Sequence, residues 1–235
     1  IAMVGRLGGG ALTALNRENG KAEWEWTGDG AAYASPVSAM LGGVKQFVTQ
    51  SQNACIGISA RDGSLLWKID FKTEYDQNIV TPVLVNDLVL FAGLGHPATA
   101  YRVVKNGNAW EPKLVWENDD AGMYMSSPVV AGNRLVGFSQ KKKGSLFCLD
   151  AAIGKTAWTS DGRLGDNAVI LAWGPLALAL TTNSELIVFK PAAEAFEPVV
   201  RYRVAGTPTW AHPAVVADGV LVKDASTLAL WTWKK

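Results

Sequence analysis

Short apolar runs separated by polar turn residues recur along the whole chain. In the clearest copy, Leu146 to Leu149 has a strand pattern, residues 150–154 have turn chemistry, and Lys155 to Trp158 resumes an extended pattern that ends in tryptophan. Helical repeats need apolar residues at three- and four-residue spacing over ten or more positions, and the Gly and Pro residues here interrupt such runs. The pattern therefore predicts an all-β chain built from a repeated unit.

The first sign of the repeat is a strand that ends in tryptophan. Four such strands end at Trp24, Trp67, Trp116 and Trp158, and a degraded fifth copy, PVVRY, ends at Tyr202. An aromatic side chain at a constant offset is predicted to pack between neighbouring units, with its N–H bonded to a nearby carbonyl.

The second sign is a Ser/Thr-Pro-Val step, because proline suits the start of a strand, where its missing N–H breaks no interior ladder bond. Pro36, Pro82 and Pro128 occupy this step and are 46 residues apart each time, and a weaker copy contains Pro213. A further copy, at residues 167–169, has lost its proline.

The third sign is a two-residue turn between apolar runs, which is typical of β-hairpins. The predicted turns are Gly42-Gly43, Asn86-Asp87, Gly132-Asn133, Gly174-Pro175 and Asp218-Gly219. Successive turns are 44, 46, 42 and 44 residues apart. Because Gly-Pro is a poor primed turn, a longer connection is the alternative at that copy.

Each unit is then four strands: a Pro-led A strand, a tight turn, a B strand, a C strand and the Trp-bearing D strand. Four antiparallel strands per 42 to 46 residues predict a β-propeller blade. Residues 1–26 supply strands B to D, and residues 212–235 supply strands A to C. We expect one domain over residues 1–235, with four complete and two partial blades, truncated at its N-terminal side.

Composition narrows the function classes. Twenty-two basic and twenty-one acidic residues give a net charge of +1, so no global field recruits nucleic acid or an acidic membrane. The longest apolar stretch, residues 169–180, is shorter than a bilayer span and contains Gly174 and Pro175, so no transmembrane segment is predicted. Cys55 and Cys148 lie in units that are not adjacent, and two separately buried thiols are expected.

The units share a C-to-D consensus: a small residue, Leu, then Asp or Asn, a turn, Gly-Lys, two residues, and Trp. It is carried by residues 14–24 and 148–158. With the Ser-Pro-Val step, this resembles the tryptophan-docking repeat of the pyrroloquinoline-quinone-like (PQQ-like) β-propellers, and above all bacterial PQQ-binding-like repeat proteins. No Trp-Asp dipeptide occurs, so the WD-repeat family is a poorer match. The resemblance covers essentially the whole chain and implies a ring of eight blades.

The resemblance implies two functions. Some family members, such as the outer-membrane assembly lipoprotein, bind partner proteins, and others are quinoprotein dehydrogenases that use PQQ and Ca²⁺ to oxidise alcohols or sugars. The enzymes carry a disulfide between adjacent cysteines, which Cys55 and Cys148 cannot form. We therefore expect a non-catalytic, periplasmic or otherwise extracytoplasmic binding scaffold with no cofactor, and keep the quinoprotein dehydrogenase as the alternative.

A binding face is expected where the segments that enter the A strands meet the B-to-C connections around a propeller's central channel. Polar and aromatic side chains that converge on a concavity favour a protein partner or a small ligand. The candidates are Tyr33, Tyr75, Asp76, Gln77, Asn78, Tyr124, Asp166, Asn167, Trp210 and His212. The alternative for all of them is that they only cap strands and bond to loop backbone.

The sequence gives weaker support for a metal site, for a catalytic motif and for a charged contact surface. Asp76 with Asn78, or Asp166 with Asn167, could offer oxygen ligands to a hard cation, but such pairs are common in turns. No phosphate loop, Cys/His metal spacing or hydrolase motif occurs. The run Lys141-Lys142-Lys143 is expected to be a solvated loop, with contact to an acidic partner as the alternative. It is too short, without interleaved aromatics, to favour nucleic acid.

Overall fold

The structure is a computed structural model that describes residues 1–6 and 9–233. All regular structure in that part of the chain is antiparallel β-sheet, apart from the 3₁₀ turns η1 (Glu74–Asp76) and η2 (Lys141–Lys143). The chain forms two compact units, residues 1–125 with 152–154, and residues 126–151 with 155–235. One domain over residues 1–235 therefore stays a prediction.

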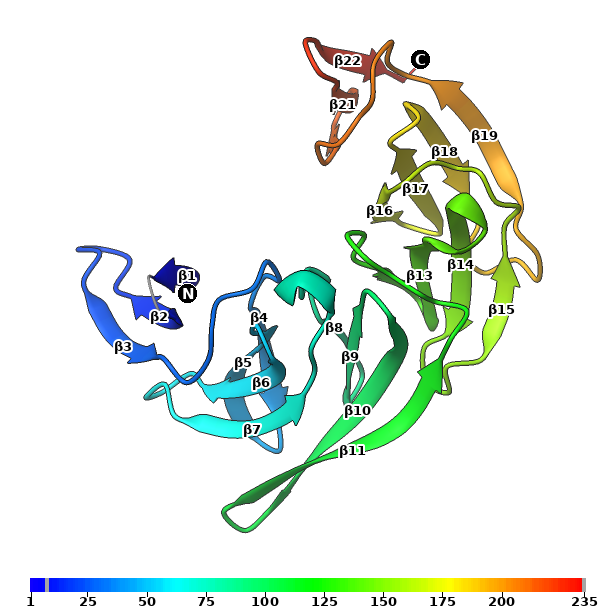
Figure 1. The fold of residues 1–235 in the computed structure, drawn as a ribbon. Coiled ribbons are helices and arrows are strands. Elements are labelled where there is room, and N and C mark those ends of the chain that lie inside the picture. The colour runs from blue at the N-terminus through cyan, green and yellow to red at the C-terminus, as the bar shows by residue number, and fades with distance from the viewer. Residues whose placement is uncertain (7–8, 234–235) are drawn as a thin grey trace. The chain divides into compact units, whose positions relative to one another are not determined.

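The first unit contains one three-stranded and two four-stranded sheets (Figure 1). Their strands are β1 (Ala2–Arg6), β2 (Gly9–Leu15), β3 (Ala22–Trp26); β4 (Val37–Leu41), β5 (Val44–Gln50), β6 (Ala54–Ser59), β7 (Leu65–Asp70); and β8 (Val83–Val85), β9 (Leu88–Gly93), β10 (His96–Asn106), β11 (Ala109–Asn118). The hairpin of β10 and β11 is much longer than the others, and in Figure 1 its tip extends beyond the sheet that carries it.

The second unit contains two four-stranded sheets and one three-stranded sheet. Their strands are β12 (Val129–Ala131), β13 (Arg134–Ser139), β14 (Ser145–Asp150), β15 (Thr156–Thr159); β16 (Ala168–Trp173), β17 (Leu176–Thr181), β18 (Glu185–Phe189), β19 (Pro198–Arg203); and β20 (Ala214–Val216), β21 (Gly219–Lys223), β22 (Leu228–Thr232). In the described part of the chain, these are the four complete and two partial blades that the repeat predicts, and the fold is a β-propeller. Lys234 and Lys235 lie outside the described residues.

The structure confirms the two-residue turn at Gly174-Pro175 and shifts the last predicted turn by one residue. At Gly174-Pro175, Trp173 pairs directly with Leu176, so the turn has two residues and no longer connection exists. Gly174 has a φ of +57°, and a type II′ turn needs a positive φ only at its first central position, so the fixed negative φ of proline suits the second. The last turn lies at residues 217–218, because Val216 pairs with Gly219 and Gly219 begins β21.

The hydrophobic core lies between neighbouring sheets within each unit. In the first unit, Trp67 and Val48 of one sheet pack with Phe91 and Val103 of the next. In the second unit, Trp158 forms edge-to-face contact with Phe189, whose ring centroid is 5.9 Å away. Burial on both faces explains why β9 is apolar throughout and why β6 is apolar up to its last residue, Ser59.

A β-bulge precedes the tryptophan position in every four-stranded sheet and in β3. Trp67 pairs with Gly57, and the register then shifts so that Leu65 pairs with Ile58. The same shift in β19 places Val200, not Tyr202, at the tryptophan position. Val200 is half-buried and packs against the core, whereas Tyr202 is 52% exposed, so the assignment of Tyr202 as the fifth copy was wrong.

Trp24 shows how neighbouring blades join. Its Nε1–H donates to the carbonyl of Ala60 in the next sheet at 3.3 Å, and its ring lies against Gly63, where an added Cβ would come within 2.6 Å. Gly154 lies against Trp116 in the same way, at 2.4 Å. Both glycines have a φ near +70°, so the glycine that opens the D strand, in Gly63-Ser64 as in Gly154-Lys155, is required by its backbone and by the neighbouring indole.

Candidate binding site

Three connections of the first unit meet and form what we call the connection cluster: residues 29–35, 50–53 and 73–78. They are the segment between β3 and β4, the turn between β5 and β6, and the segment between β7 and β8. Tyr33 N and Ala34 N both donate to the backbone carbonyl of Asn78 at 3.1 Å, which joins the first connection to the third. Four of the predicted candidates lie in residues 75–78 and one at Tyr33.

Asp29 holds the cluster together, although the sequence did not single it out. Its carboxylate accepts hydrogen bonds from Ser51 Oγ at 2.7 Å, Asn53 N at 2.8 Å and Asn53 Nδ2 at 2.7 Å. Partial burial acts to raise the pKa of Asp29, but these hydrogen bonds outweigh it and hold the pKa below its ordinary value. Asp29 is therefore an ionised clamp on the turn between β5 and β6.

Asn78 supports the cluster from inside. Its side chain is fully buried, and Nδ2 donates to the carbonyls of Ser51 at 2.7 Å and Phe71 at 3.0 Å. A side chain with no exposed surface cannot contact a partner at the surface of the cluster. Asn78 therefore positions the other candidates.

Two aromatic side chains of the cluster face solvent. Tyr33 is 72% exposed and Tyr75 is 82% exposed. Tyr75 and the following Asp76 both have positive φ values, 60° and 55°, which are unfavourable for residues other than glycine. Strained backbone is found where the surrounding structure holds it, and it is a reason to look for function.

Hydrogen bonds to the side chains of Asp76 and Gln77 hold this strained segment. Asp76 accepts from Gln52 Nε2 at 3.0 Å and forms an ion pair with Lys72 Nζ at 3.3 Å. The hydroxyl of Tyr124, after β11, donates to Gln77 Oε1. The six predicted residues of the first unit are thus brought together: Tyr33, Tyr75, Asp76, Gln77, Asn78 and Tyr124.

The other four predicted residues belong to the second unit. The backbone N–H groups of Asp166 and Asn167 donate to Thr182 Oγ1 at 3.1 and 3.3 Å, so these residues cap the turn between β17 and β18. Trp210 is 57% exposed, and His212 is exposed too. The neighbouring Thr209 is buried and donates to the carbonyl of Thr181 at 2.7 Å, which fixes the segment that carries Trp210.

The residues present do not form a calcium set. Asp76 already contacts Lys72 and Gln52, while Asn78 is buried beneath it, so the two do not present a shared group of oxygens. Within residues 1–6 and 9–233, no three His, Cys, Asp or Glu side chains gather closely enough to hold a metal ion. Asp76 and Asn78 therefore do not fit the calcium site of a quinoprotein.

Both cysteines are buried and unpaired, as predicted. Burial raises the pKa of the Cys55 thiol well above its ordinary range, and it raises the pKa of Cys148 to about 11. Because the thiolate is the reactive form, neither side chain is suited to nucleophilic chemistry.

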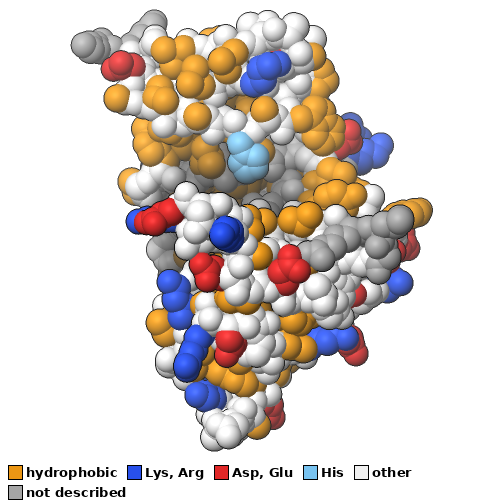
Figure 2. All heavy atoms as spheres, turned by 90° about the vertical axis from the view of Figure 1, so that its left-hand side faces the viewer, with side chains coloured by type: hydrophobic (Ala, Val, Ile, Leu, Met, Phe, Trp, Pro, Cys, Tyr) orange, Lys and Arg blue, Asp and Glu red, His pale blue; other side chains and the backbone are white. Residues whose placement is uncertain are grey.

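The lysine run forms the exposed 3₁₀ turn η2, as expected of a solvated loop. Lys142 Nζ also bonds to Thr159 Oγ1 at 3.2 Å. On the face drawn in Figure 2, positive and negative side chains are interspersed, in keeping with the net charge of +1.

The chain is similar to known proteins in sequence and in structure. The family described as "Outer membrane protein assembly factor BamB" matches residues 2–160. No curated protein sequence matches the chain significantly.

Solved structures share the fold at low sequence identity. BamB from Moraxella catarrhalis is 13% identical with a TM-score of 0.54, over 98% of this chain and 81% of that one. The computationally designed protein Ika8 is 9% identical with a TM-score of 0.61, over 86% of this chain and 61% of that one. The designed protein Ika4 is 9% identical with a TM-score of 0.50, over 64% and 88%. At these identities the likeness shows the fold alone, but the match over residues 2–160 shows the family, and the chain belongs to the BamB family of PQQ-like β-propellers.

Proposed function

We propose that the chain is a non-catalytic, extracytoplasmic propeller that binds a protein partner through the connection cluster. The observation that carries this proposal is the display of Tyr33 and Tyr75, at 72% and 82% exposure, on a framework held by the buried Asn78 and the ionised Asp29. Membership of an outer membrane protein assembly family supports a partner from that machinery and an extracytoplasmic location.

The chemistry of the cluster suits a protein interface. Tyrosine combines a large apolar surface with a polar hydroxyl and loses little conformational entropy on binding, so it is enriched at interfaces and in hot spots. The hydrogen bonds of Asp29 and Asn78 fix the backbone beneath both tyrosines before a partner arrives. Preorganisation of this kind raises affinity because less ordering remains to be done on binding.

Site-specific crosslinking tests the proposal. A photoreactive phenylalanine derivative at position 75 or 33 of the full-length protein should crosslink to a component of the outer membrane assembly machinery. Met40, which is 67% exposed on β4, is the matched control position. Equal crosslinking from positions 75 and 40 would contradict the assignment of the cluster.

The double variant Tyr33→Ala, Tyr75→Ala should then weaken binding of the crosslinked partner. Loss of hot-spot aromatics costs about 2 kcal/mol or more, which is roughly 30-fold in affinity. Unchanged affinity, with the variant folded, would place the interface elsewhere on the molecule.

The proposal also holds that the chain binds no quinone. Its support is the poor fit of Asp76 and Asn78 to a calcium ion. Addition of Ca²⁺ and PQQ to the full-length protein should give neither a bound-quinone spectrum nor dye reduction with alcohols or sugars. Turnover that is lost on Asp76→Asn or Asp166→Asn would instead establish the dehydrogenase.

A further inference from the structure

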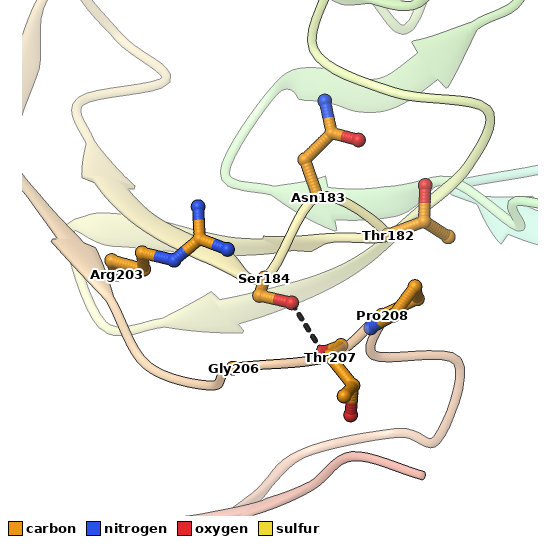
Figure 3. A pocket seen from close by; sticks show the side chains of 7 residues that line it. All are labelled: Thr182, Asn183, Ser184, Arg203, Gly206, Thr207 and Pro208. Atoms are coloured by element: carbon orange, nitrogen blue, oxygen red, sulfur yellow. Dashed lines mark hydrogen bonds between the residues drawn. The ribbon is translucent and has the colours of Figure 1, made fainter.

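A polar pocket of about 380 Å³ lies in the second unit, apart from the connection cluster (Figure 3). It is formed by the turn between β17 and β18 and by the segment that follows β19. Its polar side chains are those of Thr182, Asn183, Ser184, Arg203 and Thr207. Its volume falls in the range of sites for small ligands, about 300–1,000 Å³.

Arg203 is the charged residue of this pocket, and no carboxylate lines it. Arg201, two residues earlier on the same strand, is paired with Glu185 Oε2 at 3.2 Å, whereas Arg203 has no ion-pair partner among the described residues. The nearby carboxylate of Asp224 is engaged by the N–H groups of Ser226 and Thr227, at 3.0 and 2.7 Å. The guanidinium group of Arg203 is therefore available to an anion.

Two further donors in the pocket are unused. Thr182 is 7% exposed, and its Oγ1 accepts hydrogen bonds from two backbone N–H groups. The Thr182 hydroxyl proton has no acceptor in the described part of the chain. The side-chain amide of Asn183 has no hydrogen-bond partner there either. In Figure 3 the Arg203 side chain runs from its strand toward the turn that carries Asn183 and Ser184, and the amide of Asn183 points upward, away from Thr207.

The remaining polar groups of the pocket are already paired. Ser184 Oγ donates to the carbonyl of Thr207 at 2.5 Å, drawn as the dashed line in Figure 3. Thr207 Oγ1 accepts from Ala225 N at 3.2 Å. The N–H groups of Thr227 and Ser226, together with a hydrogen bond from the Thr207 side chain, lower the pKa of the Asp224 carboxylate. These bonds fix the two walls of the pocket and leave Arg203, Thr182 and Asn183 as a set of donors without acceptors.

The fold does not require an arginine at this position. In the sheet of β4 to β7, Phe71 N bonds to the carbonyl of Asn53, just as Val204 N bonds to that of Ser184. The residue that corresponds to Arg203 there is Asp70, with a side chain that is 92% exposed. The same backbone position thus carries the opposite charge, so Arg203 is a property of this pocket and not of the blade.

We propose that this pocket binds a carboxylate group, held by the Arg203 guanidinium with the Thr182 hydroxyl and the Asn183 amide as further donors. The planar fork of arginine matches the two oxygens of a carboxylate, and charge-assisted bonds of this kind are the strong ones. A single positive charge favours a monoanion over a dianionic phosphate. The carboxylate is supplied either by the end of a peptide chain or by a free small acid.

NMR titration of the full chain tests the proposal, with backbone amides of residues 183 and 206 as reporters. The probes are acetyl-trialanine with a free carboxylate, the same peptide as its C-terminal amide, acetate, and inorganic phosphate. We expect saturable shifts with the free peptide and none with its amide. Acetate that binds as tightly as the peptide identifies a free acid as the source, and weaker acetate binding identifies a chain terminus.

The matched variants separate the pocket from general electrostatics. Arg203→Gln should weaken binding of the free peptide by about tenfold or more. Arg163→Gln removes the same charge from an exposed position of the same unit and should change binding by less than about twofold. Arg201 is not the control, because its loss would free Glu185, which lies opposite Arg203 in the sheet. Equal weakening in the two variants, no saturable shift with either carboxylate, or tighter binding of phosphate would overturn the proposal. Arg203 is exposed, so its substitution leaves the fold intact, and the spectrum itself verifies this.

Discussion

Small residues lie opposite the tryptophans across the C-to-D hairpins, and contact distances explain why. Gly57 pairs with Trp67, and a Cβ added at Gly57 would come within 2.2 Å of the Trp67 ring and 2.6 Å of Gln46 Oε1. The indole Nε1–H of Trp67 donates to that same Gln46 Oε1 at 2.6 Å. The consensus therefore needs a small residue at this position, because the indole ring occupies the space that a larger side chain would fill. The buried side-chain amide of Gln46 accepts the hydrogen bond of the indole N–H.

Asp29 gives a prediction about pH. Its folded pKa lies below the ordinary value of 3.8, so the ionised form is favoured in the folded protein. The stability that it contributes is therefore fully present above the unfolded pKa and is lost as pH falls through the folded pKa. Asp29→Asn should lower the free energy of unfolding by about 1–3 kcal/mol at pH 7, the usual loss for hydrogen bonds to a charged group, and by less below pH 4.

Urea unfolding between pH 7 and pH 3 measures this effect. Asp70→Asn is the control, because the Asp70 side chain is 92% exposed and pairs only with Lys68 at the surface. A difference between Asp29→Asn and the wild type that stays constant down to pH 3 would show that the carboxylate charge is not what clamps the turn.

At the scale of the strands, the β-bulge decides which residue enters the core. The bulge changes the direction of the side chain that follows it. Which residue of the D strand faces the core is therefore set by the pairing register with the C strand, and not by the number of residues from the turn. In β15 this position is Trp158, which pairs with Cys148, and in β19 it is Val200, which pairs with Val188.

The two aromatic residues should therefore differ in their effect on stability. Trp158→Ala should lower the free energy of unfolding by about 3–5 kcal/mol, because it empties a core site packed against Phe189 and Phe196. Tyr202→Ala should cost about 1 kcal/mol or less, because Tyr202 is 52% exposed. Chemical denaturation of both variants checks this contrast, and a loss at Tyr202 as large as at Trp158 would restore Tyr202 as the docking residue.

The repeat was predictable because its marks are local. The proline steps and two-residue turns are each fixed by backbone chemistry within four residues, so their spacing revealed the blades. The register within a hairpin is not local: the shift that exchanges Tyr202 for Val200 depends on pairing with β18. The connection cluster was located by the same spacing, but Asp29 was missed, since its partners Ser51 and Asn53 lie 22 and 24 residues away and no motif links them.

At the scale of the whole molecule, positive and negative charges nearly balance. The net charge is +1, and charges of both signs are mixed on the face shown in Figure 2. No helix in residues 1–6 and 9–233 is long and apolar enough to cross a membrane. In the two proposals, the exposed tyrosines of the connection cluster offer apolar contact area, and the pocket at Arg203 offers a single positive charge.

Salt should separate these two kinds of binding. Between about 0.1 M and 1 M salt the Debye length falls from about 10 Å to about 3 Å, which weakens interactions of exposed charges and leaves apolar burial intact. Affinity for a protein partner at the connection cluster should change by less than about threefold, because Tyr33 and Tyr75 contribute area and not charge. Carboxylate binding at Arg203 should weaken severalfold over the same range, because the guanidinium group is exposed to the added ions. Calorimetry measures the partner affinity at both salt concentrations. A fall of more than about tenfold would show that the partner is bound by charges around the tyrosines, such as Lys72 and Asp76, and not by the apolar surface of the tyrosines.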